Sequence, residues 1–124
     1  IVLRLAYGDV SFLLTGDIEA AAEAAILGAG LDASATVLKV AHHGSDGATT
    51  APFLDAVSPS IAVVSAGESN TFGHPSPTLR LRLAGIPLLR TDLNGSVAFE
   101  NDGSRLWLDY ERGEIGLVES GFAP

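Results

Sequence analysis

The sequence predicts a single domain of the α/β (α+β) class, with a mixed sheet, flanking helices and a C-terminal antiparallel meander. Up to Gly85, short apolar segments alternate with segments of helical composition. From Ile86 onward, short strand-like segments are separated only by turn residues. A chain of 124 residues has room for one hydrophobic core, so we expect one domain.

The N-terminal part of the chain is predicted to form a hairpin followed by a helix. Residues 1–7 and 10–15 are rich in β-branched and aromatic side chains, and a Gly-Asp turn separates them. The alanine-rich residues 18–27 are predicted to be helical and are followed by glycines. Glu19 and Glu23 lie near the start of this helix, which is the end that favours anions.

Two buried strands and two helices are predicted next. Residues 36–41 and 61–65 are nearly all apolar, which is typical of strands that are covered on both faces. Thr50 and Pro52 begin one short helix. Ser76-Pro77 begins another, with serine as the N-cap and proline in the first turn.

The C-terminal part is predicted to be a meander of strands at residues 87–91, 96–100 and 105–110. Asn94-Gly95 is a common tight-hairpin sequence, and the Asn-Asp-Gly at 101–103 predicts a second turn. The last dozen residues show no clear pattern, so we treat residues 111–124 as a C-terminal tail.

Composition excludes several classes of protein. Seven basic against fifteen acidic side chains give a net charge of −8, which argues against a broad basic face for phosphate binding. No apolar run approaches the ~18 residues of a transmembrane helix. The absence of cysteine excludes disulfides and thiolate zinc sites. The chain starts at Ile1, inside a predicted strand, and contains no methionine, so we expect it to be a fragment.

Candidate functional side chains follow the predicted strands. Asp17 follows the second strand, His42 and His43 follow the third, and His74 ends the polar loop after the fourth. Ligand sites in such sheets gather beyond the strand ends, and imidazole with carboxylate suits zinc, manganese or iron. Asp17 could instead simply cap the following helix. The Gly- and Ser-containing residues 65–70 could donate backbone N–H groups to an anion, although they match no phosphate-binding motif.

Four segments together carry a resemblance to a known family. They are FLLTGDIE at 12–19, VLKVAHHGS at 37–45, NTFGHPSP at 70–77 and LRTDLNGS at 89–96. In order and spacing the chain resembles the metallo-β-lactamase-like domain of ComEC-type DNA-internalisation competence proteins. The resemblance covers roughly residues 1–110 and implies the C-terminal half of an αββα sandwich.

The resemblance also implies roles for individual residues. Asp17 matches the aspartate that bridges two metal ions, and His42, which we favour over His43, matches a metal ligand. Consecutive side chains leaving a strand point to opposite faces, so His43 would serve as a catalytic or substrate-contacting group. His74 matches a histidine that contacts the substrate phosphate or transfers a proton. The family's upstream His/Asp metal-binding run has no counterpart, so the N-terminal half of the same domain is an expected partner.

The implied function is metal-dependent hydrolysis of a phosphodiester, with two zinc or manganese ions as cofactors and single- or double-stranded DNA as substrate. We expect the chain to be a soluble domain of a polytopic bacterial cell-membrane protein that acts in competence-linked uptake, and to be inactive alone. Two alternatives remain open. The domain could hydrolyse a small ester, lactam or phosphonate, or it could be a non-catalytic half-domain that serves as a partner surface.

Overall fold

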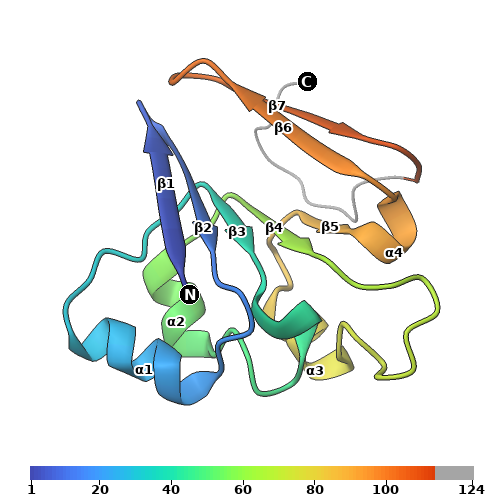
Figure 1. Cartoon of the computed structure of the whole chain (residues 1–124), viewed down its shortest axis with the longest axis horizontal. Coiled ribbons are helices and arrows are strands. Elements are labelled where there is room, and N and C mark those ends of the chain that lie inside the picture. Colours follow the sequence, from blue (N-terminus) through green and yellow to red (C-terminus); the bar gives the residue numbers. More distant parts are fainter. Residues whose placement is uncertain (114–124) are drawn as a thin grey trace.

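The computed structural model describes residues 1–113, and its centre is a five-stranded mixed sheet (Figure 1). The strand order is β1-β2-β3-β4-β5, with β1 antiparallel to β2 and every other neighbouring pair parallel. The strands are β1 (Leu3–Tyr7), β2 (Val10–Leu14), β3 (Val37–Lys39), β4 (Ile61–Val64) and β5 (Leu88–Arg90). The predicted N-terminal hairpin is confirmed as β1–β2.

Helices cover one face of this sheet. They are α1 (Ala20–Gly28), α2 (Ala51–Val57) and α3 (Pro77–Arg82), and the chain also has a 3₁₀ turn, η1 (Ala41–Gly44). Leu38 of β3, Phe53 of α2 and Leu79 of α3 are completely buried in the cluster that joins these helices to the sheet. The predicted N-cap of α3 is confirmed, because the Ser76 Oγ accepts a hydrogen bond from the Leu79 backbone N–H at 3.1 Å.

The opposite face of the sheet is covered in part by a separate two-stranded sheet, β6 (Val97–Asn101) with β7 (Leu106–Tyr110), as Figure 1 shows. Phe99 of β6 meets Phe12 of β2 edge to face, with ring centroids 5.7 Å apart. The predicted turn at 101–103 joins these two strands. Hydrogen bonds from the Arg105 backbone, the Arg105 side chain and the Ser104 backbone lower the pKa of Asp102 in this turn to about 2.

The prediction of a hairpin at Asn94-Gly95 is wrong. Thr91–Asn94 forms a short helical turn, α4, and β5 pairs in parallel with β4 instead of antiparallel with β6. A tertiary contact opposes the local turn preference, because the Thr91 hydroxyl donates to the Ala66 carbonyl at 2.9 Å. Within the helical turn itself, the Asn94 Oδ1 accepts the Arg90 backbone N–H at 2.9 Å. The C-terminal antiparallel part is therefore a hairpin and not a three-stranded meander. The predicted fold class, a mixed sheet with flanking helices, is confirmed.

Residues 111–113 are the part of the predicted tail that the structure describes; residues 114–124 lie outside it. The Glu111 backbone N–H bonds to the carbonyls of Asn94 and Ser96, which ties the end of β7 to α4. Within residues 1–113, none of the helices has both the length and the apolar content needed to cross a lipid bilayer.

Candidate functional site

The candidate residues meet at the carboxyl ends of three neighbouring parallel strands. Asp17 follows β2, η1 with His42 and His43 follows β3, and the loop that ends at His74 follows β4. The rings of His42 and His43 have centroids 6.3 Å apart, and those of His42 and His74 are 6.2 Å apart. The structure therefore brings together residues that are 25 to 57 positions apart in sequence, as expected for this edge of an open sheet.

The backbone of the two adjacent histidines is in the left-handed conformation. His42 has φ 48° and His43 has φ 53°, a region that residues other than glycine rarely occupy. The backbone N–H of His42 bonds to the Gly16 carbonyl at 2.9 Å, which holds η1 against the end of β2. The expectation that the two histidines directly leave a strand is wrong, because β3 ends at Lys39 and both residues lie in η1.

Gly44 lets η1 pack closely against the His74 loop, because it has no side chain. Gly44 has φ +85°, and a Cβ added to it would lie 2.7 Å from the Pro75 Cβ and 2.9 Å from a methyl group of Leu79. The Ser76 backbone N–H also bonds to the Gly44 carbonyl at 2.9 Å. A residue with a side chain at position 44 would push η1 away from the His74 loop.

The structure pairs the histidines with carboxylates in an arrangement that the sequence did not reveal. His43 Nε2 lies 3.7 Å from Asp17 Oδ1, and its Nδ1 donates to the Ser65 carbonyl at 2.8 Å. His42 Nδ1 instead lies 3.1 Å from Glu19 Oε1. The ring nearest Asp17 is thus that of His43, not of the favoured His42. Glu19, considered above only as a helix-start anion, joins the site because it directly precedes the first residue of α1.

Asp17 does not cap α1. The N-cap residue of that helix is Glu19, and no side chain makes the cap hydrogen bond. The Asp17 side chain is 63% exposed, and its Oδ1 lies 3.7 Å from His43 Nε2. The alternative interpretation of Asp17 as a helix cap is therefore wrong.

A second arm of the site is the loop between β4 and α3. The side chain of Asn70 braces it: Oδ1 accepts the His74 N–H at 2.9 Å, and Nδ2 donates to the carbonyls of His74 and Gly67 at 2.8 and 2.9 Å. His74 is half-buried, and its Nδ1 is a buried atom without a hydrogen-bond partner. Buried polar atoms are normally paired, so this nitrogen is an exception among the described residues.

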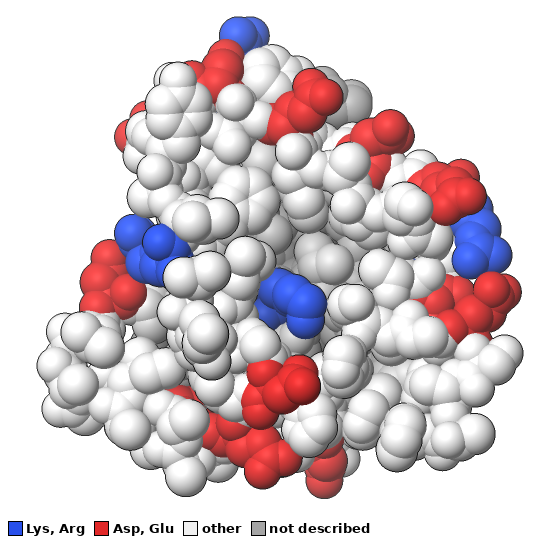
Figure 2. Space-filling model, in the orientation of Figure 1, with Lys and Arg blue, Asp and Glu red and all other residues white. Residues whose placement is uncertain are grey.

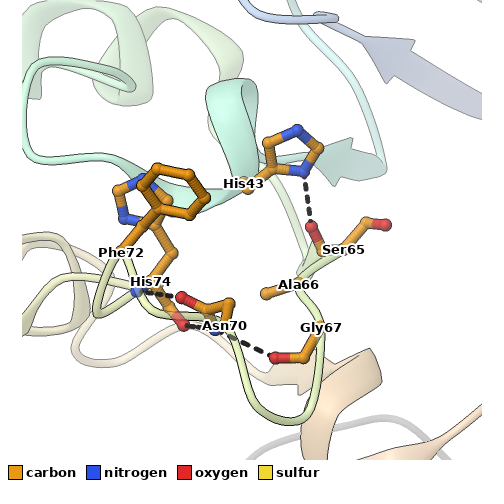
Figure 3. Close-up of a pocket in the computed structure, with 7 residues that line it drawn as sticks. All are labelled: His43, Ser65, Ala66, Gly67, Asn70, Phe72 and His74. Atoms are coloured by element: carbon orange, nitrogen blue, oxygen red, sulfur yellow. Dashed lines mark hydrogen bonds between the residues drawn. The ribbon is translucent and has the colours of Figure 1, made fainter.

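A pocket of about 420 Å³ lies between this loop and η1 (Figure 3). Its volume is within the range of small-molecule sites. In Figure 3 the rings of Phe72 and His74 overlap on one side, the ring of His43 lies apart from them near Ser65, and Asn70 lies at the base of the loop. The residues that line it are His43, Ser65, Ala66, Gly67, Asn70, Phe72 and His74.

The donor chemistry of the site fits a divalent transition metal, although the number of donors falls short. Both η1 histidines direct Nδ1 to a protein acceptor, so in the neutral ring Nε2 carries the lone pair that binds metal. Carboxylate oxygen and imidazole nitrogen suit zinc or manganese. Within residues 1–113, however, no three or more such side chains are grouped so that they could hold a metal ion. These residues therefore supply pairs of ligands rather than a complete set.

The described residues thus form an α/β domain with a histidine–carboxylate site beyond its parallel strands, and the chain has clear relatives. It is 42% identical over 101 residues to competence protein ComA of Neisseria gonorrhoeae, covering 79% of this chain and 15% of the relative. It is 38% identical over 101 residues to ComE operon protein 3 of Bacillus subtilis, covering 80% and 13%. An uncharacterized Escherichia coli protein, YcaI, is 36% identical over 110 residues, covering 85% and 15%.

These comparisons confirm the resemblance to ComEC-type competence proteins in part. One relative is named a competence protein and another a ComE operon protein, and the chain is similar to one segment of each. The chain spans only 13 to 15% of the length of these relatives. No protein-family model matches the chain, and no solved structure matches it significantly.

Proposed function

We propose that this chain is the C-terminal half of a metallo-β-lactamase-like hydrolase domain that cleaves a phosphodiester of DNA during competence-linked uptake. The observation that carries the proposal is the meeting of Asp17, His42, His43 and His74 at one edge of the sheet. The names of the competence protein and the ComE operon protein among the relatives support DNA as the substrate. The parent would be a polytopic bacterial membrane protein with this chain as a soluble domain.

The proposed roles follow the contacts in the site. Asp17 and an η1 histidine would bind the metal; His43 has its Nε2 near Asp17, whereas His42 lies beside Glu19. A bound divalent metal would lower the pKa of water and neutralise phosphoryl oxygens. His74 would hold a phosphate oxygen or protonate the leaving oxygen through its imidazole ring, since His74 lines the pocket. The missing ligands would come from the N-terminal half of the same domain, so the chain alone would be inactive.

The net charge of −8 is compatible with this proposal. On the face shown in Figure 2, acidic side chains outnumber basic ones, and the basic ones are scattered. Asp17 and Glu19 add negative charge at the site itself, which favours a cation there. Divalent metal would therefore supply the positive charge that draws a phosphate to this surface.

Metal removal tests the proposal directly. The full-length protein is expected to cleave a single- or double-stranded oligonucleotide, to lose this activity after dialysis against a chelator, and to regain it with Mn²⁺ or Zn²⁺. Small ester, lactam and phosphonate substrates are assayed in parallel. Their hydrolysis would support the alternative function, a hydrolase of small molecules. A full-length protein that retains no metal by elemental analysis and hydrolyses none of these substrates would be a non-catalytic domain.

His74→Ala is expected to lower the cleavage rate by roughly 10²-fold or more, the order of a lost acid–base group. Its metal content should stay close to wild type, because His74 is assigned to the substrate and not to the metal. Rate and metal equivalents are measured on the same preparation, with the melting temperature as a check on folding. Loss of one metal equivalent would instead identify His74 as a ligand.

A further inference from the structure

The proposed catalysis leaves one prominent side chain of the pocket without a role. Phe72 is 80% exposed, although it is a large apolar residue, and it lines the same pocket as His43 and His74. Its ring lies parallel to the His74 ring, with centroids 5.9 Å apart and an angle of 18° between the planes (Figure 3). Phe72 therefore contributes little to the hydrophobic core and presents an aromatic surface beside the site.

The backbone, rather than side-chain packing, positions this ring. The loop around it is closed by the two-way hydrogen bonding between Asn70 and His74, at 2.9 and 2.8 Å. Gly73, which joins Phe72 to His74, has φ +71°, a conformation that suits glycine. The ring is thus held at the rim of the pocket by a loop that its own hydrogen bonds fix.

We propose that Phe72 is a stacking platform for a nucleobase of a single-stranded nucleic acid whose adjacent phosphate lies at the histidines. This inference rests on the proposed function and names the form of its substrate. Stacking on an aromatic ring uses the π-face that every base has, so the stacking contact itself does not depend on charge. The net charge of −8 is therefore compatible with it. Bases within a duplex are already stacked on each other, which favours a single strand.

The layout of the pocket supports this assignment. Ala66 and Gly67 lie across the pocket from Phe72 and offer an apolar wall without bulky side chains (Figure 3). The imidazoles of His43 and His74 supply the polar contacts beside the ring. An aromatic platform next to groups that contact phosphate matches the alternation of base and phosphate along a single strand.

Base dependence of binding provides the test. The full-length protein, with its metal bound, is titrated with a fluorescein-labelled phosphorothioate oligothymidylate, which resists cleavage, and with an abasic oligonucleotide of the same backbone and equal length. Phe72→Leu is expected to weaken binding of the oligothymidylate roughly 5- to 100-fold, the scale of one lost stacking contact. The abasic probe should bind equally to both proteins, and Phe72→Trp should retain wild-type affinity. Leu81→Ala is the control, because Leu81 is 77% exposed and lies outside the pocket lining.

Four results would overturn the inference. If Phe72→Leu binds the oligothymidylate as tightly as wild type does, Phe72 does not stack on a base. If the substitution weakens binding of both probes equally, Phe72 contacts the nucleic-acid backbone. If Phe72→Leu has a lower melting temperature than wild type and neither protein binds with base dependence, another part of the protein covers Phe72. Failure of the proposed function is separate: wild-type protein that binds with base dependence but never hydrolyses would refute the hydrolase and leave the stacking site. Hydrolysis without any base dependence would refute the stacking site alone.

Discussion

Asp17→Asn is expected to reduce hydrolysis by the full-length protein by ~10³-fold or more, because metal catalysis supplies several kcal/mol and each tenfold corresponds to about 1.4 kcal/mol. The amide has the size of the carboxylate but lacks the negative charge proposed to bind metal. Folding should change little, since the side chain is 63% exposed and caps no helix. The initial rate and the metal content by elemental analysis are the two measurements.

Asp55→Asn is the matched control, because Asp55 is an exposed aspartate on α2 rather than in the site. It removes the same charge from the protein as a whole and should leave rate and metal content unchanged. Near wild-type turnover and full metal content in Asp17→Asn would reduce Asp17 to an ordinary surface carboxylate. The proposed metal site would then be wrong.

Glu23→Ala is expected to lower the free energy of unfolding by about 3–5 kcal/mol, because buried donors would lose a charged acceptor. Glu23 is fully buried on α1 and accepts three hydrogen bonds from the chain that leads into α2. The donors are the Thr49 N–H at 2.5 Å, the Thr50 N–H at 2.8 Å and the Thr50 hydroxyl at 2.7 Å. Denaturant unfolding measures the total loss, and hydrogen exchange at the two amides shows whether it originates there.

Two further variants define what the Glu23 carboxylate contributes. Glu23→Gln keeps the shape and one acceptor oxygen, so its stability should fall between wild type and Glu23→Ala. Glu19→Ala removes another glutamate side chain, one that is exposed, and should change stability by no more than about 0.5 kcal/mol. A Glu23→Ala protein as stable as wild type would show that these hydrogen bonds contribute nothing net.

Most of the secondary structure is predictable from local signals. The hairpin of β1 and β2, the buried strands β3 and β4 and the Ser76 cap of α3 all depend on residues that are neighbours in sequence. The hairpin predicted at Asn94-Gly95 does not form, because that prediction used only the local turn preference. Parallel pairing of β5 with β4 buries Leu89 completely instead. Burial between two layers of the fold outweighs the preference of a two-residue turn.

The candidate site is predictable in part. Parallel strands end at one edge of a sheet, so the placement of Asp17, His42, His43 and His74 after strands already predicts their meeting. Phe72 was not singled out as a functional residue, because an aromatic residue in a loop has no periodic pattern that marks it as exposed. Its exposure depends on how Asn70 closes the loop, which is a contact between residues 70 and 74 and not a property of position 72.

The amino-acid sequence by itself thus determined most of the order of the elements, the strand ends that carry the polar residues, and the similarity to competence proteins. Only the tertiary structure decided, within each pair of similar side chains, where each one lies and what it faces. Glu23 is buried beneath the start of α2 while Glu19 reaches the site, and His43 rather than His42 faces Asp17. These choices depend on helix packing and on left-handed backbone at η1, and both are imposed by contacts between residues distant in the chain.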